Sequence, residues 1–214
     1  MAILHPTATL VPSKLDLLAP WLPTREWYRG PAAPQLVRVA SFRFDDPGGE
    51  VGIETMLVTA GDGVIYQIPL TYRGTPLDGH EAWLVGTSEH SLLGPRWIYD
   101  GCGDPLYAAT LASTILTGAG NAEEYANIDG RRERREPSMT VRGSGSQAAA
   151  NQPASTIIQV VDGDPTRIVT DAGELSVRRV LDGSDAEPDP QAAVLTGTWP
   201  GQATPVTLAT ASPR

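Results

Sequence analysis

The sequence predicts an α+β fold in which an antiparallel sheet wraps around a helix. Its 22 glycines and 19 prolines separate short runs rich in Val, Ile, Leu, Thr and Tyr, which is typical of strands joined by turns. Two other stretches place apolar residues near helical spacing and begin with capping residues. A chain of 214 residues can bury a sizeable core without disulfides or metals.

Four strands are predicted in the first part of the chain, separated by glycine-rich turns at 45–49, 61–63 and 74–79. An antiparallel meander is their simplest arrangement. Pro69 lacks an N–H group for a central ladder, so we expect an edge strand or a bulge there. The predicted strands are Gln35–Phe44, Glu50–Ala60, Val64–Tyr72 and Glu81–Thr87.

Two helices are predicted. The first covers Ser13–Trp21, with its first residue as the N-cap. The second follows Asp104, whose carboxylate can accept from an early helical N–H, and places Pro105 at the first helical position. It continues toward Gly118, and residues 122–128 (AEEYANI) are expected to add one or two turns. We expect this second helix to lie across one face of the sheet.

A boundary is predicted near residues 130–137, where the charge run Arg131–Glu136 is followed by the small-residue stretch Gly143–Ala154. It divides the chain into domains 1–135 and 136–214. The second domain is β-rich, and Asp182–Pro190 is expected to be an exposed loop. Its predicted strands are Ser155–Asp162, Thr166–Thr170, Leu175–Leu181, Val194–Gly197 and Pro205–Ala209.

Charge and composition exclude several classes of partner. The formal net charge is −9, which repels nucleic-acid phosphates and anionic lipid headgroups. No segment reaches the length of a membrane-spanning helix, and the N-terminus lacks the basic and apolar regions of a signal peptide. Cys102 is the only cysteine, so no internal disulfide can form. We therefore expect a soluble, cytoplasmic protein that binds neither nucleic acid nor membranes.

Several metal-binding residue types fall close together between positions 80 and 104, but no pair has a recognised ligand spacing. We expect turn and cap chemistry there, with Asp104 as a helix cap, and predict no metal site. The residues are His80, His90, Asp100, Cys102 and Asp104.

No motif identifies a nucleophile or an acid–base pair. Cys102 and Ser91 lack the Gly-x-Ser-x-Gly setting of a nucleophile elbow. The adjacent carboxylates at 45–46 and 123–124 do not face a common cleft and are expected to be solvated. No catalytic residue is predicted.

Nine aromatic residues have two interpretations. Sugars stack on exposed aromatic rings, whereas a chain with two phenylalanines needs Trp and Tyr to fill its core. We favour the core role and keep carbohydrate stacking as an alternative. The residues are Trp21, Trp27, Tyr28, Tyr66, Tyr72, Trp83, Trp97, Tyr99 and Tyr107.

A set of these positions resembles the N-terminal cap region of maltokinases and related actinobacterial sugar kinases, including glucosamine kinases. The resemblance implies that residues 1–135 form a curved antiparallel sheet packed on a long helix. It rests on Trp21, Leu22, Pro23, Trp27, Tyr28, Tyr66, Gln67, Tyr99 and Asp100.

The second domain resembles a degenerate version of the opening hairpin of the kinase N-lobe. By this resemblance, Gln152, Ser155 and Thr156 match the phosphate loop, and Arg178 or Arg179 stands where the phosphate-binding lysine is expected. Arginine presents its charge differently from lysine. The chain also lacks a His-x-Asp segment followed by asparagine. We therefore expect no cofactor and treat the four residues at 152, 155, 156 and 178 as weak nucleotide-binding candidates.

The resemblance and the missing kinase groups together predict a non-catalytic, maltokinase cap-like protein. It is expected to act as an accessory or regulatory binding module in maltose, trehalose or α-glucan metabolism, with a sugar kinase or a glucan or trehalose enzyme as its protein partner. One alternative is a reduced sugar kinase-like enzyme that binds ATP. A second alternative is a carbohydrate-binding module.

Overall fold

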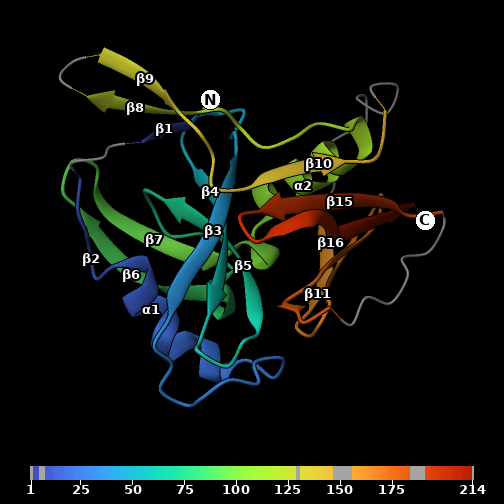
Figure 1. Ribbon diagram of the computed structural model, residues 1–214, viewed down its shortest axis with the longest axis horizontal. Coiled ribbons are helices and arrows are strands. Elements are labelled where there is room, and N and C mark those ends of the chain that lie inside the picture. Colours follow the sequence, from blue (N-terminus) through green and yellow to red (C-terminus); the bar gives the residue numbers. More distant parts are fainter. Residues whose placement is uncertain (1, 5–7, 129–130, 147–155, 184–190, 214) are drawn as a thin grey trace.

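Two antiparallel sheets enclose the helix α2 (Pro105–Thr117) in the computed structural model (Figure 1). The structure describes residues 2–4, 8–128, 131–146, 156–183 and 191–213. The predicted α+β class is confirmed in its coarse form, because the described residues contain antiparallel sheets and two α-helices. Strands dominate, and both α-helices are short.

The first sheet is a curled half-barrel that contains most of the first part of the chain (Figure 1). All its pairings are antiparallel. Strand β14 (Val180–Leu181), from the second part of the chain, pairs with one end of β5 (Ile65–Arg73), and β7 (Gly94–Asp100) pairs with the other end on the same side. In spatial order its strands are β2 (Leu10–Val11), β6 (Leu84–His90), β7 (Gly94–Asp100), β5 (Ile65–Arg73), β4 (Gly52–Thr59) and β3 (Val37–Phe44), with β14 (Val180–Leu181).

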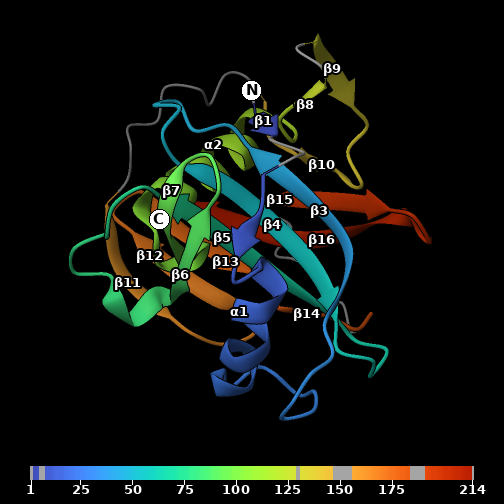
Figure 2. The same ribbon diagram turned by 90° about the vertical axis from the view of Figure 1, so that its left-hand side faces the viewer.

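The second sheet is antiparallel and comes from the second part of the chain. Its order is β10 (Thr140–Gly143), β15 (Ala193–Trp199), β16 (Gln202–Pro213), β13 (Gly173–Val177), β12 (Thr166–Thr170) and β11 (Ile157–Val161). A small third sheet extends away from the body (Figure 2) and contains β1 (Ala2–Leu4), β8 (Glu124–Ile128) and β9 (Arg131–Arg135).

The prediction for the helices is confirmed for their starts and wrong for the length of the second. Helix α1 (Lys14–Trp21) has a capping box formed by Ser13 and Asp16, and Asp104 caps α2 by accepting from the Leu106 N–H. However, α2 has only 13 residues. It ends because Gly118 adopts a left-handed φ of 69°, where an added Cβ would lie 2.4 Å from the carbonyl oxygen of Gly145.

The structure also corrects several predicted secondary-structure elements. Residues 124–128 form strand β8, not helix, because β1 and β9 pair with them on both sides. The charge run is strand β9. Residues 81–83 form a 3₁₀ turn, and 22–24 and 101–103 form two more. Strand β7 was not predicted.

Strand β5 is central and pairs with β4 in continuous register through Pro69, so the predicted edge strand or bulge at Pro69 is wrong. The N–H of Gln67 donates to the Arg179 carbonyl at 2.8 Å, and the alternation of a strand points the Pro69 nitrogen to the same side. On that side, β14 pairs with residues 65–66 and β7 with residues 70–73. The proline therefore occupies the gap between two partner strands, where no ladder bond is lost.

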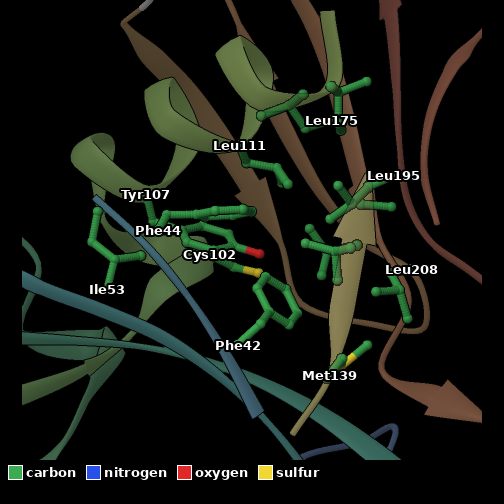
Figure 3. Packing of buried hydrophobic residues seen from close by; sticks show 14 of the residues in the cluster. Phe42, Phe44, Ile53, Cys102, Tyr107, Leu111, Met139, Leu175, Leu195 and Leu208 are labelled. Carbon is green, nitrogen blue, oxygen red and sulfur yellow. The ribbon is translucent and has the colours of Figure 1, made fainter. Parts of the chain in front are cut away.

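The main hydrophobic core lies between α2 and the two sheets (Figure 3). Phe42 and Ile53 come from the first sheet, Leu195 and Leu208 from the second, and Cys102 is completely buried among them. A second core lies on the opposite face of the first sheet, beneath α1. The predicted domain boundary at residue 135 stays a prediction. The main core contains side chains from before and after this residue.

Candidate functional site

Arg179, one of the two arginines that the resemblance places where a lysine is expected, is completely buried at the junction of the two sheets. Its Nη2 donates to Asp100 Oδ2 at 2.6 Å and its Nε to Thr166 Oγ1 at 2.7 Å. The guanidinium carbon lies 5.0 Å from the centre of the Trp27 ring. We call these four residues the Arg179 centre.

The electrostatics of the Arg179 centre keep the arginine charged. Burial acts to lower the pKa of Arg179, but the negative charge of Asp100 outweighs it and the pKa is raised. The backbone of Arg179 is also held, since its N–H donates to Asp164 Oδ1 at 2.8 Å. With no exposed surface and with partners from both sheets, the Arg179 side chain holds the two sheets together. Its Nη1 is also buried and has no hydrogen-bond partner among the described residues.

The described residues do not show the other nucleotide-binding candidates gathered at one site. Gln152 and Ser155 lie outside them. Thr156 is exposed, and its N–H donates to Asp171 Oδ1 at 2.9 Å. Arg178 Nη2 donates to the Val180 carbonyl at 3.4 Å. Nucleotide binding by these residues stays a prediction.

The candidates for metal binding have turn and cap contacts in the structure. His80 Nδ1 lies 2.7 Å from the Gly103 carbonyl oxygen. Asp104 caps α2 and forms two 2.7 Å bonds with Arg73, and the Thr71 hydroxyl donates to it at 2.7 Å. Within the part of the chain that the structure describes, no three His, Cys, Asp or Glu side chains gather as metal ligands.

A polar cavity of about 670 Å³ opens where the β3–β4 and β6–β7 turns approach β8 and β9. Glu54 lies at its base with 2 % of its surface exposed. Three donors reach Glu54 Oε2: Lys14 Nζ, Arg43 Nη2 at 3.2 Å and the Tyr72 hydroxyl at 2.9 Å. We call this cavity the Glu54 pocket.

Two carboxyl groups of the Glu54 pocket have opposite pKa shifts. Burial acts to raise the pKa of Glu54, but Arg43 and Lys14 outweigh it and lower the pKa to about 2. The pKa of Glu124 is raised, mainly because that side chain is half-buried. A carboxylate with a pKa near 2 is a weak base, so the pocket is better suited to binding hydroxyl or charged groups than to proton transfer.

Sequence reasoning missed the Glu54 pocket. A glutamate in the middle of the apolar strand β4 was the available signal, because a buried carboxylate requires a cationic partner. Its partners come from α1, β3 and β5, and the sequence alone does not show that these elements meet.

Most of the nine aromatic residues are core residues. Six of them are at most 9 % exposed, while Tyr28, Trp83 and Trp97 are half-buried. Trp83 packs closely on Gly103: a Cβ added at Gly103 would lie 2.0 Å from the Trp83 ring. The described aromatic side chains therefore do not form an exposed stacking platform. The six buried residues are Trp21, Trp27, Tyr66, Tyr72, Tyr99 and Tyr107.

Residues 21–104 match the family model of the maltokinase N-terminal cap domain, which confirms the resemblance over this part of the chain. The match begins at the end of α1 and ends at the cap of α2, so it covers the first sheet from β3 to β7. A search of curated proteins found no match for the chain. None of the described helices has the length and apolar content needed to cross a bilayer.

Proposed function

We propose that this protein is a non-catalytic, cytoplasmic module of maltose, trehalose or α-glucan metabolism that acts by binding a protein partner. The proposed partner is a sugar kinase or an enzyme that modifies glucan or trehalose. The cap-domain match over residues 21–104 supports the metabolic context. The burial of Arg179 is the single observation that carries the non-catalytic part of the proposal.

Kinase chemistry requires a cation that reaches the phosphates of the nucleotide. Arg179 has no exposed surface and is bound to Asp100 and Thr166. Lys14, the only lysine in the chain, belongs to α1 and is bound to Glu54. Arg178, the other arginine at the expected lysine position, is half-buried and donates to the Val180 carbonyl. All three cations have contacts within the protein, which favours a binding role over phosphoryl transfer.

Carbohydrate binding is a second candidate, and the Glu54 pocket favours it. The pocket has the volume of a small-molecule site and is lined by hydroxyl, carboxylate and cationic groups that can form hydrogen bonds with sugar hydroxyls. Maltose and maltotriose titrations followed by calorimetry would measure this binding. An Arg43→Met variant, which alters the pocket wall, is expected to weaken it if it occurs there.

The proposal is tested with the purified 214-residue chain. We expect no transfer of phosphate from Mg·ATP to maltose, glucose or glucosamine, and stable co-elution with a purified sugar kinase, glucan enzyme or trehalose enzyme. Phosphotransfer that disappears in a Ser155→Ala/Arg178→Met variant would overturn the proposal in favour of a reduced kinase. Failure to co-elute with any of these enzymes would remove the proposed partner.

A further inference from the structure

A second, larger cavity of about 950 Å³ runs along one side of α2. Its other walls are the start of β13, the end of β16 and the β3–β4 turn. Helix α2 contributes the face that carries Leu106, Ala109, Ser113 and Leu116, which are spaced at the helical repeat. We call this cavity the α2 groove.

The floor of the α2 groove is apolar. Phe44, Leu175 and Ala211 line it and are at most 5 % exposed. Phe44 and Leu175 approach α2 from the two sheets (Figure 3). Of the α2 residues that line the groove, Thr114 is buried, and the others are half-buried or exposed. Several of them are small, so large apolar side chains of another molecule could approach the helix closely.

The charged side chains that line the α2 groove are all acidic: Asp45, Glu123 and Glu174. This distinguishes it from the Glu54 pocket, whose lining contains both signs. Glu123 pairs with Arg134 at 3.4 Å and Glu174 with Arg167 at 2.6 Å, but both arginines are more than half exposed. Such exposed ion pairs contribute little to stability, so cationic side chains of a partner can replace these two arginines.

We infer that the α2 groove docks a segment of the partner protein that carries large apolar side chains flanked by arginine or lysine. This inference rests on the proposed function and specifies its partner. The apolar floor would bury the hydrophobic side chains, and the acidic rim would select cations and repel acidic segments. A second copy of this chain is a poor occupant because its formal charge of −9 adds repulsion at an acidic rim.

The test uses two fluorescein-labelled amphipathic peptides of about 18 residues, or five helical turns. One has Leu on one face and Lys on the other, and its counterpart has Glu in place of Lys. Fluorescence polarisation measures their binding to the wild-type 214-residue chain and to three variants. Ser113→Trp obstructs the groove at an exposed position, Glu123→Gln removes a rim charge, and Ala203→Trp is the matched control at an exposed site on β16.

We expect saturable binding of the Lys peptide that weakens about tenfold in Ser113→Trp and a few-fold in Glu123→Gln, typical magnitudes for a central and a rim contact. Ala203→Trp should change it by less than about twofold. Equal binding of the Glu peptide, or equal weakening by both Trp variants, would overturn the inference. A wild-type dimer in sedimentation that Ser113→Trp dissociates would also overturn it, in favour of a second copy.

The two proposals fail in different ways. If the wild-type chain co-elutes with no sugar kinase, glucan enzyme or trehalose enzyme, the proposed function fails whatever the peptides do. If such an enzyme co-elutes equally well with the wild type and with Ser113→Trp, the partner is correct and the α2 groove is not its docking site.

Discussion

The Arg179 centre and the Glu54 pocket both pair a buried carboxylate with cations, but they differ in access to water. In the Arg179 centre, both Arg179 and Asp100 have no exposed surface. In the Glu54 pocket, the carboxylate is buried while Lys14 and Arg43 are 26 % and 18 % exposed. The Arg179 centre joins the first sheet to the second, whereas the Glu54 pair lines a cavity. A buried carboxylate paired with a cation therefore stabilises the fold in the Arg179 centre and forms part of the cavity wall in the Glu54 pocket.

Breaking the Arg179 centre should have the largest effect on stability. An Arg179→Met substitution leaves the Asp100 carboxylate buried without its cation, which typically costs about 3–5 kcal/mol. Urea denaturation followed by tryptophan fluorescence would measure the loss. In the double variant with Asp100→Asn, part of the stability should return because no charge is left unpaired. A loss below about 1 kcal/mol would contradict full burial of the pair.

The Glu54 pocket predicts a pH dependence of stability. The pKa of Glu54 is about 2 in the folded protein and near 4.5 ordinarily, so its contribution is present above pH 4.5 and is lost as the pH falls toward 2. The difference of about 2.5 pH units corresponds to about 3 kcal/mol. Urea denaturation at a series of pH values between 7 and 3 would follow this loss, and Glu54→Gln should make the decline shallower. An equally steep decline in the variant would place the titrating group elsewhere.

A smaller effect is expected for Lys14→Met. Arg43 and Tyr72 still donate to Glu54 in this variant, and the lysine is partly solvated, so the expected loss is about 1 kcal/mol. The midpoint of chemical denaturation at pH 7 is the measurement. A loss as large as that of Arg179→Met would show that the two sites are equally shielded from water.

The smallest effect is expected for Arg167→Ala, which removes an exposed partner of Glu174. Both side chains of this pair are substantially solvated, so we expect a change within about 0.5 kcal/mol despite two good hydrogen bonds. Thermal unfolding at low and high salt would detect it. A larger, salt-insensitive loss would mean that hydrogen-bond geometry, and not burial, decides the strength of these pairs.

Local signals were the reliable part of the sequence prediction. Ser13 and Asp104 were predicted as caps, and both bind N–H groups within a few residues in the sequence. The strand β12 was also predicted with its bounds. These features depend on neighbours along the chain, which is the information that a sequence displays directly.

Long-range pairing explains what the sequence did not predict. Asp100 and Arg179 are separated by 79 positions, and β5 is central only because β14 returns to it from the second part of the chain. Residues 124–128 have a composition compatible with a helix, but two neighbouring strands override that preference. The Glu54 pocket and the α2 groove were missed for the same reason.

Cys102 gives the protein an internal reporter of core opening. Its thiol has no exposed surface, and burial raises its pKa. Alkylating reagents require an accessible thiolate, so iodoacetamide should modify the native protein only during rare excursions that expose the space beneath α2. Because no second thiol competes, the mass shift of the whole chain with time would record the frequency of those excursions without any engineered label.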